Sequence, residues 1–399
     1  MNRTIPPTSN QSIRLANNAT ATTLDRRALL KTGSVLGLST LALGLMPRAI
    51  LHASAHQDAT VEAATPVLGA QADGTNLWKV QVGGMDMENS TDLQAFFPSE
   101  ITINAGDQIW FAEGMPGFHT VAFGYGDDIP PMFIPDPELA SPVSGPPQML
   151  LNPAVIMPSA SMAVNGVDVV NTGVDILWDP TVPTIVSFPT AGTFDYLCIP
   201  HQGVMRATVI VQDAGADLPL DQAGYDAKAQ EQMDAVKAEG IAAAAAFAEA
   251  TQETQADGST LWTAAAGAGE GQARVMRMLP NPLEIKVGDS VKWINQSPGE
   301  PHTITFIGAG ETPPEDLEVS AFADGTPKFS VNPMSLWAQG GNTFDGSSYL
   351  NSGYFGVAEA GQPMEFTATF TAPGEFTYYC ILHGDAEGGG MAATLTVVE

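Results

Sequence analysis

The chain has 399 residues and is strongly acidic, with 44 Asp and Glu against 15 Lys and Arg and a formal net charge of −29. This balance excludes nucleic acid as a partner, because phosphate binding requires clustered Lys and Arg. It fits a protein that is soluble outside the cell, and it would steer a basic protein partner towards the surface.

The N-terminal segment, residues 1–55, has the pattern of an export signal rather than of a fold. Arg26 and Arg27 precede a moderately apolar, Gly-containing run over residues 33–46, and residues 53–55 (Ala-Ser-Ala) offer a cleavage site. The pattern resembles a twin-arginine signal. The run is shorter than the about 20 apolar residues of a membrane span. We therefore expect a periplasmic or extracellular protein with no stable membrane span after cleavage.

The rest of the chain contains one repeat at a spacing of about 180 residues, which is the scale of a duplicated domain. Residues 71–78 (QADGTNLW) recur as residues 255–262 (QADGSTLW). Residues 105–107 (AGD) likewise recur as residues 287–289 (VGD). The length of the chain also suits two domains of ordinary size.

Each copy is rich in short β-branched or alternating runs punctuated by Gly, Pro, Asn and Asp, which is typical of strands. Such runs are residues 101–103, 291–294, 303–306, 366–370 and 394–398. Several strands in about 140 residues indicate a β-sandwich. Two irregular segments rich in Pro and Gly, residues 132–162 and 311–361, interrupt the copies.

Between the copies, residues 221–251 are rich in Ala, Glu, Gln and Lys and contain no Pro. Their apolar positions on one helical face are Met233, Val236, Gly240, Ala244 and Phe247. This spacing predicts a helix that packs on one or both domains, although Gly240 lowers the helix propensity. The predicted organisation is a signal peptide at 1–55, a first domain at 56–213, a helical linker at 214–254 and a second domain at 255–399.

Four of the six histidines, both cysteines and two methionines fall in two copies of one pattern. The first copy is His119, Cys198, His201 and Met205, and the second is His302, Cys380, His383 and Met391. The other two histidines, His52 and His56, flank the predicted cleavage site. One thiolate, two imidazoles and a weak thioether are the ligands of a type 1 (blue) copper centre. The pattern predicts two type 1 copper ions per chain.

A disulfide and a zinc site are the two alternatives to copper for these residues. Two cysteines in an exported protein would ordinarily form a disulfide, here between Cys198 and Cys380. We favour metal binding because each Cys has a His three residues later and the two occupy matching places in the repeat. Zinc could use one Cys and two His with an open catalytic position, but a thioether in the fourth position argues against it.

The axial ligand of the second centre depends on the alignment. Counting from His383 places Glu387 where Met205 stands in the first copy, whereas counting back from the final strand places Met391 there. We favour Met391, because packing fixes strand register while a Gly-rich loop such as residues 388–390 absorbs insertions.

Residues 196–205 and 299–306 resemble the two ligand segments of cupredoxins of the plastocyanin and pseudoazurin type. The resemblance covers residues 72–213 and 256–399. It implies an all-β fold of two Greek-key sandwiches, with Cys and two His as equatorial copper ligands and Met as the axial ligand. It also implies a protein that carries single electrons.

The same resemblance implies that the later histidines, His201 and His383, lie under an apolar docking patch and conduct the electron. Departures from the family pattern surround the first ligand. Phe118 stands where Pro is usual, and Thr120 and Thr303 stand where Asn is common. These changes leave open how the sulfur of each centre is hydrogen-bonded.

Two-domain cupredoxins also include nitrite reductases and small multicopper oxidases, which need further histidines, commonly as His-x-His, for type 2 or trinuclear copper. This chain has no His-x-His, and the two type 1 sets use four of its histidines. We therefore expect an electron carrier rather than an enzyme, with a basic cytochrome or oxidase as its redox partner. A copper protein for storage, delivery or sensing is the alternative.

Overall fold

The computed structural model describes residues 65–115, 117–139, 146–174, 177, 182–356 and 362–399. All of them belong to one compact unit, Leu43–Glu399. The predicted export signal, together with His52 and His56, lies outside the described residues. Within the described ranges, none of the helices has the length and hydropathy that a membrane crossing requires.

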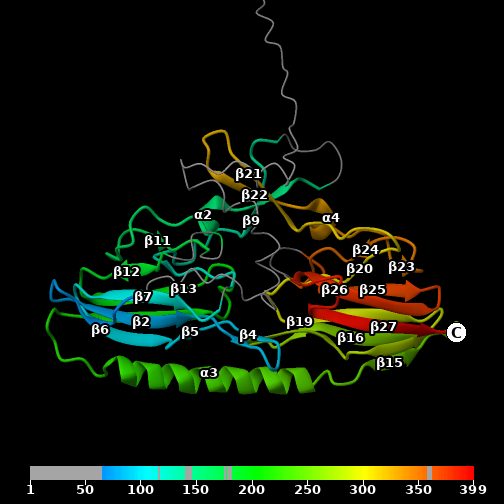
Figure 1. Ribbon diagram of the computed structural model, residues 1–399, viewed down its shortest axis with the longest axis horizontal. Helices are drawn as coiled ribbons and strands as arrows, with labels where there is room; N and C mark the ends of the chain where they lie inside the picture. Colours follow the sequence, from blue (N-terminus) through cyan, green and yellow to red (C-terminus); the bar gives the residue numbers. More distant parts are fainter. Residues whose placement is uncertain (1–64, 116, 140–145, 175–176, 178–181, 357–361) are drawn as a thin grey trace, which may run out of the picture. The chain divides into compact units, whose positions relative to one another are not determined.

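The first half forms two facing sheets, as the strand pattern predicted (Figure 1). One sheet has the order β1-β2-β7-β12, with β5 also paired to β2; its strands are Gly69–Ala70, Asn76–Val82, Gln108–Glu113, Ile185–Ser187 and Phe96–Phe97. The other has the order β11-β8-β13-β14-β6; its strands are Val170–Asn171, Ala122–Phe123, Gly192–Leu197, Arg206–Gln212 and Glu100–Asn104. Most pairs are antiparallel, but β2 runs parallel to β7 and β14 to β6.

The second half repeats this arrangement. One sheet contains β23-β25-β19-β16-β17, with β15 also paired to β16; its strands are Thr343–Phe344, Glu365–Phe370, Ser290–Gln296, Thr260–Ala268, Ala273–Leu279 and Thr251–Thr254. The other has the order β18-β27-β26-β20-β24; its strands are Leu283–Lys286, Gly390–Val398, Gly374–Gly384, Thr305–Phe306 and Leu350–Asn351. The parallel pairs recur as β16 with β19 and β18 with β27. The fold is therefore all-β and duplicated.

Each sandwich encloses its own apolar core. Cys198 and Met205 belong to the first core, and Cys380 and Met391 to the second. Aromatic side chains fill both, and Trp293 is the largest fully buried side chain. Since full burial of one large apolar side chain contributes about 1.5–3 kcal/mol, each ligand loop is anchored by its Cys and Met in a well-packed core.

The repeated Gly-Asp and Leu-Trp motifs meet inside each half. The Asp107 carboxylate accepts hydrogen bonds from Trp78 Nε1 at 2.9 Å and from the Asn76 backbone N–H at 2.8 Å. In the second half, the Asp289 carboxylate accepts from Trp262 Nε1 at 3.1 Å. Burial would raise the pKa of Asp289, but these hydrogen bonds outweigh it and lower the pKa. A buried carboxylate satisfied in this way ties two neighbouring strands together.

The predicted helix is present as α3, Gln222–Ala245, and it is capped by Asp221, whose side chain accepts from the Gly224 N–H. It contacts β2, β5 and β4 of the first half and β16 and β17 of the second (Figure 1). Gly240 is required at its position: an added Cβ would lie 2.6 Å from Thr91 Cγ2. Close packing thus outweighs the low helix propensity of Gly.

The two halves are joined by strand pairing at two places. The first sheet of the second half continues through β17 into β4 and β3 of the first half, Thr91–Leu93 and Met85–Asp86. The interrupting segments form a shared sheet, β21-β22-β10-β9, with strands Leu317–Ala321, Pro327–Val331, Met149–Leu151 and Phe133–Pro135. Each segment also has a one-turn helix, α2 (Pro153–Ile156) or α4 (Pro333–Leu336). The segments that looked irregular in the sequence therefore hold the halves together.

Candidate metal centres

The first half brings His119, Cys198 and His201 together, although they are far apart in the sequence. The two Nδ1 atoms are 3.2 Å apart. Cys198 Sγ lies 3.9 Å from His119 Nδ1 and 3.4 Å from His201 Nδ1. Cys198 and His119 are buried, and His201 is half-buried.

The second half repeats this geometry with His302, Cys380 and His383. The two Nδ1 atoms are again 3.2 Å apart, and Cys380 Sγ lies 3.9 Å and 3.4 Å from those of His302 and His383. A metal with bonds of about 2.0 Å to nitrogen and about 2.3 Å to sulfur, as for Zn²⁺, would hold trigonal ligand atoms about 3.5–3.7 Å apart. Both triads therefore fit one trigonal ion, and their soft thiolate with two imidazoles suits copper.

The strands explain why these side chains meet. Cys198 directly follows β13, and its N–H donates to the Met205 carbonyl at the start of the neighbouring strand β14. His119 lies three residues before β8, and the start of β8 pairs with the end of β13, because Ala122 is opposite Leu197. In the second half, His302 is fixed by a two-way backbone bridge to Phe355. Each triad thus joins two segments that the sheet holds rigidly.

Thr120 and Thr303 hold the sulfur in place. The backbone N–H of Thr120 donates to Cys198 Sγ at 3.4 Å, and that of Thr303 to Cys380 Sγ at 3.3 Å. The Thr120 hydroxyl accepts from the Ile199 N–H at 2.8 Å, which fixes the residue after the Cys. The strand predicted over residues 303–306 is shorter in the structure, where only Thr305–Phe306 form β20.

The electrostatics of the metal-free triads favour a thiolate. Burial raises the pKa of the Cys198 thiol, but the charge of His201 and hydrogen bonds from His119 and His201 lower it to about 5. The same causes in the second half lower the pKa of Cys380 to about 5. Burial lowers the pKa of His383, but the Cys380 thiolate raises it to about 10. The thiolate is the form that binds metal, so each cysteine has its ligating form at neutral pH, and metal binding would release the proton that the imidazole holds.

The methionines occupy equivalent register positions. In the first half Leu197 pairs with Arg206, which places Met205 opposite Cys198. In the second half Tyr379 pairs with Ala392, so that Met391 directly precedes the paired residue as Met205 does, and the register shifts between Tyr379 and Gly384. Both methionines are fully buried.

Glu387 has a different environment from that of Met391. It is exposed, and its backbone N–H donates to Asp385 in the loop. Register and burial therefore both favour Met391 over Glu387 as the counterpart of Met205.

Two glycines leave room for the first His of each triad. A Cβ on Gly83 would lie 2.5 Å from His119 Nε2, and a Cβ on Gly267 would lie even closer to His302 Nε2. Both glycines have positive φ, +60° and +75°. The imidazole rings therefore pack against bare backbone, and a side chain at either glycine would push the ring.

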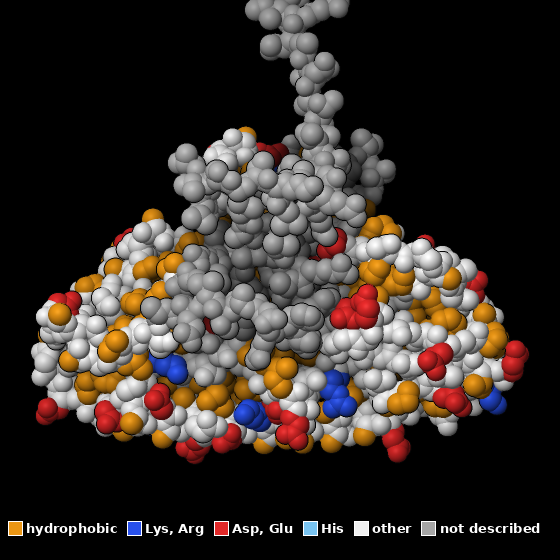
Figure 2. Space-filling view, in the orientation of Figure 1, with side chains coloured by type: hydrophobic (Ala, Val, Ile, Leu, Met, Phe, Trp, Pro, Cys, Tyr) orange, Lys and Arg blue, Asp and Glu red, His pale blue; other side chains and the backbone are white. Residues whose placement is uncertain are grey.

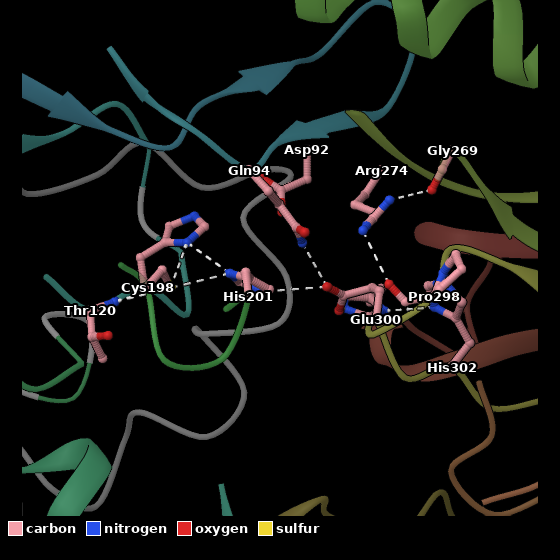
Figure 3. Close-up of polar contacts among 12 residues, drawn as sticks. Asp92, Gln94, Thr120, Cys198, His201, Gly269, Arg274, Pro298, Glu300 and His302 are labelled. Carbon is pink, nitrogen blue, oxygen red and sulfur yellow. Dashed lines mark hydrogen bonds and ion pairs between the residues drawn. The ribbon is translucent and has the colours of Figure 1, made fainter. Parts of the chain in front are cut away.

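The second His of each triad binds the same carboxylate (Figure 3). His201 Nε2 lies 3.3 Å from Glu300 Oε2, and His383 Nε2 lies 3.1 Å from Glu300 Oε1. Gln94 Nε2 donates to Glu300 Oε2 at 2.7 Å. Burial raises the pKa of Glu300, but the hydrogen bonds from His201 and His383 hold it well below its usual range.

The structure thus differs from the implied apolar patch over the later histidines. The Nε2 edges of His201 and His383 face Glu300 inside the protein, and their side chains are 9% and 21% exposed. Sequence reasoning missed Glu300 and Gln94. One signal was present: Glu300 stands two residues before His302, where the first copy has Gly117 before His119.

Comparisons with known proteins give one family match and several similar solved structures. Residues 84–212 match the family model of copper-binding proteins of the plastocyanin/azurin family. Among solved structures, a methionine-to-alanine mutant of amicyanin in the Cu(I) form is 18% identical, with 37% of this chain and 97% of that chain covered and a TM-score of 0.20. A reduced tryptophan-to-tyrosine mutant of amicyanin is 19% identical, with the same coverage and a TM-score of 0.19. Residues 84–212 therefore match the plastocyanin/azurin family of copper-binding proteins, and the second half repeats their strand order and their group of His, Cys and His.

Proposed function

We propose that this protein is an exported carrier of single electrons with two type 1 copper centres. Its equatorial ligands are His119, Cys198 and His201 in the first centre, and His302, Cys380 and His383 in the second. The axial ligands are Met205 and Met391. The observation that carries the proposal is the pair of matching triads, each with ligand atoms within 4.8 Å of one another. Copper held there would supply a one-electron couple.

The rigidity of the ligands supports electron transfer. Cys198 and Cys380 are fully buried, and each sulfur accepts a backbone N–H from a segment fixed by the sheet. Ligands held in this way keep their positions when the charge at the centre changes by one electron, so little rearrangement opposes the transfer.

The use of the histidines supports a carrier rather than an enzyme. The four histidines within the described part of the chain all belong to the two triads. A type 2 or trinuclear copper site would need further imidazoles. Storage or delivery of copper is the alternative function. Burial of both thiolates favours a tightly held metal over facile exchange.

The acidic surface supports a basic redox partner. Asp and Glu side chains are scattered over both halves on the face shown in Figure 2, and the whole chain has a net charge of −29. Such a field increases the rate of encounter with a positively charged protein and is screened by salt. We propose a basic cytochrome or oxidase as the partner, met in the periplasm or outside the cell.

Redox titration of the copper-loaded protein, followed by its visible spectrum, tests the proposal. We expect each centre to gain and lose one electron reversibly, with no phenol oxidase or nitrite reductase turnover above that of free copper. Copper should stay bound during challenge with a chelator. Sustained turnover that Cys198→Ser abolishes would show an enzyme, and rapid loss of copper to the chelator would show a storage or delivery protein.

A further inference from the structure

A single carboxylate lies between the two candidate centres. One oxygen of Glu300 binds His201 of the first triad and the other binds His383 of the second (Figure 3). We propose that Glu300 is the bridge through which an electron passes between the two centres, so that they act as one coupled pair. This inference rests on the proposed electron-carrier function.

The protonation pattern of the imidazoles suits a bridge. In each triad the Nδ1 atoms point to the metal position, which leaves Nε2–H free to donate. A ligating His commonly donates its second N–H to a carboxylate, which fixes the ring and raises its basicity as a ligand. Here the same carboxylate accepts from both rings. The path from one centre to the other is therefore imidazole, carboxylate, imidazole, with two hydrogen bonds.

The carboxylate is held firmly in this position. Glu300 and Gln94 are buried, at 6% and 1% exposure, and Gln94 donates to the oxygen that His201 also binds. Arg274 is 2% exposed, and its positive charge attracts the negative charge of the Glu300 carboxylate. Arg274 is itself fixed by the carbonyls of Gly269 and Pro298 (Figure 3). These contacts stabilise a buried carboxylate that would otherwise be costly.

The backbone fixes the two halves on either side of the bridge. Asp92 of β4 pairs with Arg274 of β17. Two matching hydrogen bonds flank this pair, from Gln94 N–H to Gln272 O and from Met276 N–H to Ser90 O, each of 2.8 Å. The bridge is therefore spanned by continuous sheet rather than by a flexible hinge.

Only one half can supply the carboxylate. The first copy has Gly117 where the second has Glu300, and a Cβ on Gly117 would lie 2.6 Å from His119 Cδ2. One Glu therefore serves both centres, and the duplicated protein is asymmetric at this point. The step itself is balanced: one electron leaves the reduced centre and reduces the other, and no proton has to leave Glu300 or either imidazole.

The test is the rate of electron transfer within the copper-loaded full chain. Met205→Leu in every sample separates the two centres in potential and spectrum, because the axial ligand tunes both. After a pulse of radical reductant, we expect a phase whose rate does not depend on protein concentration, as electrons redistribute between the centres. Glu300→Ala should abolish this fast phase while both centres keep their copper. Glu300→Gln should slow the fast phase. The Gln amide oxygen can accept from one imidazole N–H, but its NH₂ group is a donor and cannot accept from the other.

A matched control separates conduction from simple attachment of the halves. Lys328→Met removes another contact between the halves, the ion pairs of Lys328 with Asp136 at 2.6 Å and Glu138 at 3.0 Å, and leaves the bridge intact. It should leave the fast phase unchanged. An unchanged fast phase in Glu300→Ala, or equal slowing by Lys328→Met, would overturn the inference. If Glu300→Ala does not fold, the same comparison is made with Glu300→Gln.

A second measurement reports the bridge without electron transfer. In the reduced, diamagnetic protein labelled with ¹⁵N, the Nε2–H protons of His201 and His383 should exchange slowly with water. Both protons should exchange faster in Glu300→Ala. In Lys328→Met their exchange rates should stay unchanged. A parent protein with no concentration-independent phase, but with two reversible centres, would overturn the bridge and leave the carrier function standing. Absence of reversible reduction at either centre would instead contradict the carrier function.

Discussion

The two halves of this protein are nearly identical at the triads and differ just outside them. The distances within the triads agree between the halves at 3.2, 3.4 and 3.9 Å. Outside them, Glu300 stands where the first copy has Gly117, and the loop after the second His is longer in the second half, from His383 to Met391. Duplication preserved what holds the metal and changed what surrounds it.

The difference indicates where each kind of constraint acts. A triad needs a fixed separation of three atoms, which the strands impose equally in both halves. The Nε2 edges of His201 and His383 both face Glu300 of the second half, so a single group serves both centres. Substitutions in one half at a time test this contrast, because the other half serves as an internal reference.

The largest effect is expected from Gly83→Ala. The new Cβ would collide with His119, and a non-Gly residue at φ +60° also costs about 1–3 kcal/mol. We expect the first centre to lose its copper and the second to keep its own, which metal analysis and the visible spectrum measure. Gly126→Ala is the matched control, with φ +55° and nothing within 4 Å of the added Cβ. Equal loss in both variants would show that backbone strain alone was responsible.

A smaller effect is expected from a buried acid of the second half. Burial raises the pKa of Asp316 to about 6, against a hydrogen bond of 2.6 Å from the Tyr354 hydroxyl. The folded state therefore holds this proton more tightly than the unfolded state. The free energy of unfolding should fall by about 3 kcal/mol as pH rises from about 4 to about 6, and this contribution should then stay constant.

Denaturation of the metal-free protein at several pH values measures this slope. Asp316→Asn should remove the fall between pH 4 and pH 6. Asp136 should change the free energy of unfolding in the opposite direction. Burial raises the pKa of its carboxyl, but Lys328 outweighs burial and lowers the pKa, so the stability that Asp136 contributes is lost as pH falls. An unchanged slope in Asp316→Asn would show that another group titrates.

The smallest effect is expected at the axial positions. Met391→Leu should shift the potential and spectrum of the second centre and leave its copper bound, because Cys and the two His hold the metal while the axial ligand tunes it. Met205→Leu should do the same in the first centre. A potential that responds to Glu387→Gln but not to Met391→Leu would show that the two centres differ in their axial ligand.

Much of this architecture could be predicted from the sequence, because its signals are local or repeated. Cys198, His201 and Met205 lie close together in the sequence, and the Ala-, Glu-, Gln- and Lys-rich composition without Pro indicates the helix α3. The joining of the halves could not be predicted in the same way. Pairing of β10 with β22 links segments that read as irregular, since strands of three and five residues give little periodicity.

Glu300 was missed for a related reason. A Glu beside a ligand is ordinary in an acidic chain, and only the relative placement of the two halves brings it between His201 and His383. The difference between the repeats at this position was visible, but its meaning depended on contacts between residues about 80 to 100 positions apart. The role of the Thr120 and Thr303 backbone was hidden in the same way, because an N–H leaves no trace in the sequence.

Copper content together with the visible spectrum tests the central claim most directly. The account predicts two coppers per chain and intense blue absorption in the oxidised protein. Cys198→Ser and Cys380→Ser should each remove one copper and its share of the absorption, and the double variant should bind neither. A single copper in the parent protein, or a disulfide between Cys198 and Cys380 found by mass spectrometry, would contradict the account.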